Sequence, residues 1–411
     1  MMKPTTFVAI ALGSFIAGKA LGTTHFPPLR IPKPDGPNGP VPGCFGASVA
    51  IAGKFAFVGD PCEPSPTESG AGAVYRLKRS GAGWAVDRRF DTAQAAYYGA
   101  FGTSLAIRYN KLAIGAPGEG TGGVVHVFDD AFSDTLSLAN VIKPFFPAPG
   151  AGFGASVAPL FSAFFGGFVI GAPYGACPSG GAGGFAYPTW DSNVYACNPE
   201  VGESARFGSA AMSFGKQVLI GAPGSDSQGP SGAAYLVDMG VFGFESPKIV
   251  SQFVPSDPAI GRRFGVSLAT NGSVIAIGAP VSVAPGSGEV WVYRGSVPNW
   301  YVDAILVEPV SSPTPSFGRG VALSGDVLWV GSPNTPGGGA VYEFVGGMGS
   351  WAASYTFAPE PADASAGLGT ALAADGATWI AGAPAAMPAG GPYTGAVYIS
   401  ADDYLFTDNF E

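Results

Sequence analysis

The chain has 411 residues and a formal net charge of −9, and only 12% of its residues are charged. Such an acidic, charge-poor chain has no basic stripe to follow a phosphate backbone, which argues against binding to nucleic acids and anionic membranes. Its 64 glycines and 38 prolines exceed average usage. However, the glycines recur at fixed places in a strand-rich period, so the composition does not indicate a low-complexity chain.

The first 22 residues (1–22) predict a secretory signal peptide. Lys3 supplies a positive charge, residues 7–17 form a short apolar core, and residues 20–22 offer small residues at a cleavage site. The apolar run is too short to span a membrane. A buried first strand or an uncleaved anchor is the alternative. A Pro-rich lead, 23–43, follows and contains one strand-like piece at residues 29–31.

Seven copies of one hairpin pattern fill residues 44–400. In each copy Phe-Gly or Leu-Gly precedes the first strand, and Gly-x-Pro ends the second. The clearest copy spans residues 264–280, where Asn271 and Gly272 between two apolar runs predict a hairpin with a type I′ turn. A period of about 50 residues indicates a propeller, a solenoid or an array. The opening residues are Phe45, Phe101, Phe153, Phe207, Phe264, Phe317 and Leu368.

Each repeat contains four predicted strands. A third strand begins as Gly-Ala-Val-Tyr or a close variant, and a fourth carries widely spaced aromatic residues in three repeats, as at residues 84–90. The first two strands are apolar on both faces, as in sheets packed between neighbours. Four-stranded sheets packed radially give a propeller, whose edges are short and protected. With no amphipathic helix after the signal, we predict an all-β fold: a seven-bladed β-propeller of four-stranded antiparallel blades.

The repeat resembles the FG-GAP repeat, which builds the seven-bladed propeller of integrin α subunits and occurs in many secreted bacterial proteins. The resemblance covers residues 44–400 and rests on Phe-Gly, Gly-Ala-Pro and Gly-Ala-Val-Tyr in one order. It implies a protein or glycan partner at the loop face. The copies depart from the pattern at Asp60 and Ser332, which replace the alanine of Gly-Ala-Pro, and at Leu368. Four extra residues around 159–167 predict a bulge or a longer turn.

Chemistry-bearing motifs are scarce. Integrin-type repeats often carry an Asp-rich calcium loop between the first two strands, where several oxygens converge on one cation. The corresponding turns here lack that spacing, and two of them bring a lysine, Lys54 and Lys111. We therefore expect no metal and no cofactor. His25 and His126 are the only histidines and offer little for a Ser/His/Asp triad, so we expect a non-enzymatic protein.

The loops between second and third strands share one end of the propeller with the loops that lead into Phe-Gly. Binding residues commonly sit on such loops, because the rigid scaffold positions them. The candidate ligand-binding residues are Glu119, Tyr174, Asp226, Ser287, Asn334 and Tyr393. We interpret the chain as a secreted or cell-surface recognition or adhesion module, acting as a monomer. The alternatives are an extracellular hydrolase with a carboxylate site at the channel face and a propeller lectin.

Four cysteines fit an oxidising compartment. Cys44 precedes the first strand of one hairpin and Cys62 follows its second strand, so both lie at the same end. Cys177 and Cys197 flank the third and fourth strands of the third repeat, again at one end. We predict the disulfides Cys44–Cys62 and Cys177–Cys197, since two strands return the chain to its starting side.

The seventh repeat lacks a recognisable fourth strand before the acidic-aromatic tail 401–411. Residues 29–31 stand before the first Phe-Gly, where any other repeat would have its fourth strand. An open ring would expose a strand edge, which is an aggregation hazard. We predict that this N-terminal segment supplies the outer strand of blade seven. The rival is a local hairpin with residues 404–406.

Overall fold

The computed structural model describes most of the chain from residue 27 to residue 400. The described ranges are 27–36, 39–81, 83–92, 96–161, 166–177, 181, 183–189, 194–199, 205–224, 231–240, 246–257, 261–281, 288–310, 316–347, 349–359, 366–387 and 391–400. The predicted signal peptide and the tail 401–411 lie outside them. No helix occurs among the described residues, so none of them forms an apolar helix long enough to cross a membrane.

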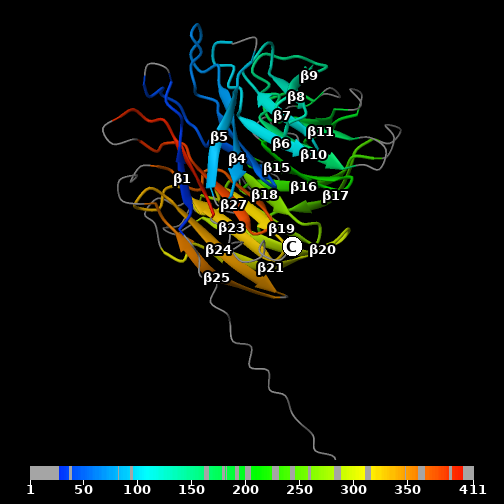
Figure 1. The fold of residues 1–411 in the computed structure, drawn as a ribbon. Helices are drawn as coiled ribbons and strands as arrows, with labels where there is room; N and C mark the ends of the chain where they lie inside the picture. Colours follow the sequence, from blue (N-terminus) through cyan, green and yellow to red (C-terminus); the bar gives the residue numbers. More distant parts are fainter. Residues whose placement is uncertain are drawn as a thin grey trace, which may run out of the picture.

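Seven four-stranded antiparallel sheets make up the molecule, which confirms the predicted β-propeller (Figure 1). Blade one is β2 (Ser48–Ala52), β3 (Phe55–Asp60), β4 (Ala73–Ser80) and β5 (Gly83–Phe90), and blade two is β6 (Ser104–Arg108), β7 (Lys111–Ala116), β8 (Val124–Asp129) and β9 (Ser137–Ile142). Blade three is β10 (Ser156–Phe161), β11 (Gly166–Ala172), β12 (Phe185–Pro188) and β13 (Ala196–Cys197), and blade four is β14 (Ala210–Phe214), β15 (Gln217–Ala222), β16 (Ala233–Asp238) and β17 (Lys248–Phe253). Blade five is β18 (Ser267–Thr270), β19 (Val274–Ala279), β20 (Glu289–Ser296) and β21 (Asn299–Val307), and blade six is β22 (Gly320–Ser324), β23 (Val327–Ser332), β24 (Ala340–Gly347) and β25 (Ser350–Phe357).

Blade seven joins the two ends of the chain. Its first three strands are β26 (Leu372–Asp375), β27 (Thr378–Ala383) and β28 (Ala396–Ile399), and its outer strand is β1 (Leu29–Pro32). Strand β1 pairs antiparallel with β28 over its whole length, and in Figure 1 the dark blue strand lies beside the red end of the chain. The predicted closure by the N-terminal segment is confirmed. Residues 404–406 of the rival hairpin lie outside the described residues.

Neighbouring blades interlock through the glycines of the repeat. The innermost strands β2, β6, β10, β14, β18, β22 and β26 contact one another in ring order, including β2 with β26. At the first junction Gly102 has a φ of 95°, and its carbonyl oxygen would lie 2.1 Å from a Cβ added to Gly59. The hydroxyl of Ser48 donates to the same carbonyl at 2.7 Å. A Cβ at Gly382 would meet the carbonyl of Gly46 at 1.8 Å, so the junction between blades seven and one has the same form.

The core lies between blades rather than inside each one. The cluster between blades one and two combines Phe57 with Leu112 and Ile114, all fully buried. The Phe of each Phe-Gly is also fully buried, and the Phe45 ring meets the Tyr75 ring edge-on at 5.2 Å. Deleting such a ring costs about 3–5 kcal/mol in typical cores. The repeat aromatics therefore hold adjacent blades together.

One local expectation is wrong, and one pair of alternatives is decided. At the hairpin of blade five only Gly272 has a positive φ, so the turn is not type I′; Asn271 instead accepts from the backbone N–H groups of Ser273 and Val274 through its side chain. In blade three the pairing of β10 with β11 runs without a register shift from Ser156 to Phe161. The extra residues there lengthen the hairpin, which is the second of the two predicted alternatives, and the paired strands contain no bulge.

Candidate ligand-binding site

A buried charged cluster fastens the N-terminal segment to blade one. Lys33 follows β1, and its Nζ lies 2.7 Å from Oδ2 of Asp60 and 2.9 Å from Oε2 of Glu63. All three side chains are almost completely buried. Asp60 occupies the position that holds alanine or serine in the other repeats. A buried carboxylate needs a partner, so Lys33 explains this departure from the repeat.

The two carboxylates of this cluster respond differently to their surroundings. Burial raises the pKa of Asp60 above its usual value and outweighs the opposing effect of Lys33. Burial also acts to raise the pKa of Glu63, but the hydrogen bond from Tyr75 and the nearby Lys33 and Arg89 together hold it below the usual 4.5. The Tyr75 hydroxyl donates to Glu63 Oε2 at 2.7 Å, and Arg89 Nε donates to Oε1 at 3.0 Å. Glu63 therefore stays ionised and ties the lead to β4 and β5.

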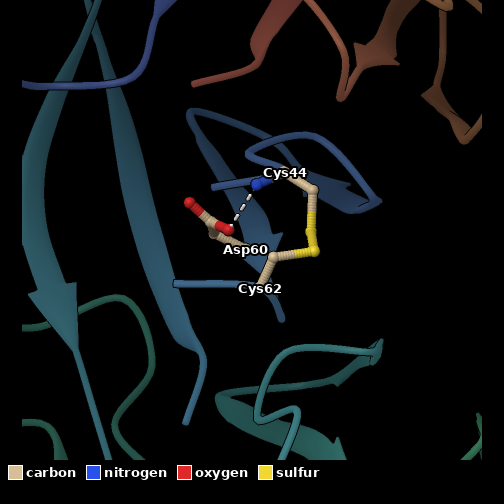
Figure 2. A group of neighbouring side chains, drawn as sticks. All are labelled: Cys44, Asp60 and Cys62. Carbon is tan, nitrogen blue, oxygen red and sulfur yellow. Dashed lines mark hydrogen bonds between the residues drawn. A yellow bond between two sulfur atoms is a disulfide. The ribbon is translucent and has the colours of Figure 1, made fainter. Parts of the chain in front are cut away.

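A disulfide reinforces the same place. Figure 2 shows Cys44 joined to Cys62, with the backbone N–H of Cys44 donating to Oδ1 of Asp60 at 2.7 Å. Both predicted cysteine pairs are confirmed, with Cα–Cα distances of 5.4 Å for Cys44–Cys62 and 5.7 Å for Cys177–Cys197.

The group Cys44, Asp60 and Cys62 is also the one set of potential metal ligands gathered among the described residues. Metals bind cysteine as the thiolate. Both sulfurs are consumed by the disulfide, and Asp60 is already bound by Cys44 and Lys33. The group therefore does not fit a metal ion and has a structural role.

An open pocket of about 830 Å³ lies over this cluster, where blades seven, one and two meet. Its size is within the range of small-ligand sites. Four prolines and two tyrosines dominate its lining, and none of its lining side chains is charged. The lining residues are Pro42, Gly43, Pro61, Cys62, Pro64, Ser69, Gly70, Tyr98, Ala100, Thr103, Pro392 and Tyr393.

The two tyrosines are held by their loops while their rings remain open to solvent. Tyr98 is 62% exposed and Tyr393 is 53% exposed. Tyr98 has a left-handed φ of 52°, and its N–H donates to the carbonyl of Ser69 at 2.8 Å. Gly70 makes room for the Tyr98 ring, since a Cβ there would lie 2.8 Å from Cδ1. The Tyr393 carbonyl accepts from the N–H of Gly43 at 3.0 Å. The backbone of the pocket is thus fixed before any ligand arrives.

A smaller pocket of about 400 Å³ lies on the outer side of the same loop and is lined in part by Ser65, Arg89 and Asp91. Arg89 bonds to Glu63 and, at 2.6 Å, to Asp91. Its charges are engaged in the structure, so we take the larger pocket as the candidate site.

The predicted ligand-binding residues fall at different places. Glu119 is buried, and its Oε2 lies 2.9 Å from Nε2 of His126, which occupies the tyrosine position of Gly-Ala-Val-Tyr in blade two. Tyr174 is 63% exposed on blade three, and Asn334 is exposed on blade six. Of the described candidates only Tyr393 lines the large pocket. Asp226 and Ser287 lie outside the described residues.

Sequence reasoning missed Tyr98 and the prolines of the pocket. The signal was present, because Tyr97 and Tyr98 form an aromatic pair in a loop just before Phe101. Exposed aromatics on a loop are a common mark of a binding site. What the sequence could not show is that this loop meets residues 392 and 393 from the far end of the chain.

Comparison with known proteins does not assign the chain to a family. No model of a known protein family matches the chain, and no curated protein matches it significantly. The seven-bladed propeller and the geometry of its loop face therefore carry the functional argument.

Proposed function

We propose that this protein is a secreted, non-enzymatic recognition module whose seven repeats are FG-GAP repeats. It binds an uncharged, extended segment of a partner protein in the pocket between Tyr98 and Tyr393. The observation that carries the proposal is an open pocket with two exposed tyrosines, four prolines and no charged lining side chain.

The pocket chemistry favours a proline-rich or otherwise apolar peptide over a sugar. Proline-rich segments dock in aromatic-lined grooves, where rings cover the pyrrolidines. A sugar needs several converging polar groups, and the polar lining side chains here are the hydroxyls of Ser69, Thr103, Tyr98 and Tyr393. The Cys44–Cys62 disulfide and the Lys33 ion pairs limit motion of the pocket floor. A preorganised site loses less entropy on binding.

Secretion and family membership are supported by separate features. Two disulfides suit an oxidising compartment. The ordered recurrence of Phe-Gly, Gly-x-Pro and Gly-Ala-Val-Tyr supports the FG-GAP assignment, since each of these glycines lies at a junction between blades.

The test is direct binding by the mature protein to a decaproline peptide, to an array of proline-rich peptides and to an array of neutral glycans. We expect peptide binding that weakens at least tenfold in the double variant Tyr98→Ala/Tyr393→Ala, since a stacked aromatic contributes on the order of 1.4 kcal/mol or more. Tyr301→Ala is the matched control, because Tyr301 is 56% exposed on the outer strand β21. Binding of glycans alone, or peptide binding unchanged in the double variant, would reject the peptide proposal.

A further inference from the structure

Three exposed arginines lie on the loop face, across the ring from the pocket lined by Tyr98 and Tyr393, which we call the tyrosine pocket. Arg206 and Arg263 stand directly before Phe-Gly in blades four and five, and Arg319 stands directly after Phe-Gly in blade six. These turns lead into β14, β18 and β22, the innermost strands of consecutive blades. The arginines therefore lie at one end of the ring of inner strands.

The backbone at two of these arginines is unusual for the residue type. Arg206 and Arg263 both have a left-handed φ of 56°. The turn itself imposes this conformation, because Ala100 has a φ of 54° at the same position, and blades three and seven have Gly152 and Gly367 there. Glycine adopts a left-handed φ freely, whereas other residues do so at a cost of about 1–2 kcal/mol. Strained positions of this kind cluster at ligand sites, so the use of arginine here points to a function.

The described residues provide no counter-charge for these three arginines. Within the described ranges, no carboxylate pairs with Arg206, Arg263 or Arg319. The neighbouring Arg262 shows the contrast, because it pairs with Glu289 and with Asp257. Exposed like charges gathered in this way are stabilised when an anion binds among them.

Arg206 and Arg319 each interact with a neighbouring side chain. The Arg206 guanidinium lies over the Tyr174 ring, 5.6 Å from its centroid. Burial by the surrounding protein and, secondarily, the charge of Arg263 lower the pKa of Arg319.

We propose that Arg263 and Arg319, flanked by Arg206, bind an oxyanion of the sulfate, phosphate or carboxylate kind. Guanidinium groups form paired, charge-assisted hydrogen bonds with such anions. This site differs from the tyrosine pocket in place and charge, so each site is tested without the other.

The test titrates the whole protein with sodium sulfate, sodium phosphate and sodium acetate, each against sodium chloride of equal ionic strength. Calorimetry and thermal unfolding report binding. We expect at least one oxyanion to bind, with Kd raised about tenfold or more by Arg263→Gly and by Arg319→Ser. Both variants should fold, because glycine precedes Phe-Gly in blade three and Leu-Gly in blade seven, and Ser209 follows Phe-Gly in blade four.

The control is Lys54→Ala, which removes one exposed positive charge from the β2–β3 turn at the opposite end of the propeller. We expect this variant to bind the oxyanion as the wild type does. Three results would overturn the proposal: no oxyanion acts differently from chloride, the Arg263 and Arg319 variants bind like wild type, or Lys54→Ala weakens binding equally. The anion whose binding depends on the arginines identifies the chemical group.

Discussion

The junction between blades seven and one differs from the junction between blades five and six. Blades five and six follow one another in the chain. Beside the interlock of the repeat, the described residues include two carboxylates that join them: Glu308, which directly follows β21 and accepts from Thr335 and Tyr342, and Asp303 of β21. Asp303 links the two outer strands. It accepts hydrogen bonds from Trp351 Nε1 at 2.9 Å and from the N–H of Gly349 at 3.1 Å. Blades seven and one are not consecutive, and their junction adds a borrowed strand, the Lys33 cluster and a disulfide.

This difference shows where the ring needs reinforcement. A covalent connection keeps consecutive blades near each other, so the repeat interlock and a few bonds are sufficient there. At the junction of blades seven and one, the chain must hold two distant segments together, and loop-closure entropy opposes this. The added contacts also fix the floor of the tyrosine pocket. The candidate site therefore lies beside the reinforced junction of blades seven and one.

Removal of the closing strand should have the largest effect. Deletion of residues 27–35 removes β1 with its buried Ile31, and it leaves Asp60 and Glu63 buried without Lys33. We expect a loss of about 5 kcal/mol or more and loosening of the whole ring, measured by denaturant unfolding. Deletion of residues 402–411 is the control and should change little. The reverse ranking of the two deletions would contradict the role of β1.

Loss of Lys33 alone should cause the second largest decrease in the free energy of unfolding. Lys33→Met leaves two buried carboxylates without their lysine, which typically costs about 3–5 kcal/mol. Adding Asp60→Ala, which restores the residue common in the other repeats, should recover part of that loss. Exposed Lys54→Met should change the free energy of unfolding by less than about 0.5 kcal/mol. Equal effects of Lys33→Met and Lys54→Met would show that the cluster contributes nothing to closure.

The two disulfides should contribute equally to the stability of the fold, but only one of them should affect ligand binding. Each closes a loop of similar length, with sequence separations of 18 and 20. Replacing either pair by alanine should therefore cost about 3 kcal/mol in the chain-entropy model. Only Cys44→Ala/Cys62→Ala should weaken ligand binding, because Cys62 lines the pocket. Equal ligand binding by the two double variants would show that the Cys44–Cys62 disulfide does not contribute to the binding site.

The Asp303 link should have a smaller effect that depends on pH. Burial raises the pKa of Asp303, but bonds from Trp351 and Arg294 hold it below the usual 3.8. The ionised carboxylate therefore stabilises the fold above pH 3.8, and this contribution is lost as the pH falls through the lowered pKa. Asp303→Asn should cost about 1.5–3 kcal/mol at pH 7 and progressively less in acid. A difference independent of pH would show that the charge of Asp303 is not involved.

Chelation should have the smallest effect of all. The turns between first and second strands lack an Asp-rich spacing, and the one ligand group among the described residues contains a disulfide. Thermal unfolding with and without a calcium chelator should coincide. A decrease of several degrees on chelation would reveal a metal requirement that this account does not contain.

The sequence was sufficient to predict the architecture, because the same four-strand pattern recurs seven times. Phe-Gly, Gly-x-Pro and Gly-Ala-Val-Tyr mark strand ends at a constant spacing, and the missing outer strand of blade seven pointed to residues 29–31. The sequence did not reveal the register shifts between third and fourth strands in five blades, such as that at Arg76 and Leu77. The repeated motifs mark where strands begin and end, and they do not mark where the pairing of two strands shifts.

The candidate site was predicted less well. The loop face was identified, but the sequence did not show that Asp60 and Glu63 share a buried partner. Their common partner Lys33 comes from the lead, and no local spacing connects the three residues. Glu119 was expected on the loop face, but it turns inward and meets His126, as Glu63 at the same repeat position meets Tyr75. A contact between distant segments decides the first case, whereas the second depends on a local contact whose geometry the repeat pattern does not show.

The most direct test of closure is hydrogen exchange at β28 in the unaltered protein. Strand β28 (Ala396–Ile399) is covered by β1, whereas without β1 it would be a free edge. The comparison strand is β24 (Ala340–Gly347), the third strand of blade six, which β25 covers. We predict that the amides of β28 exchange as slowly as those of β24, and only with global unfolding. Exchange in β28 that is orders of magnitude faster would contradict a ring closed by the N-terminal strand.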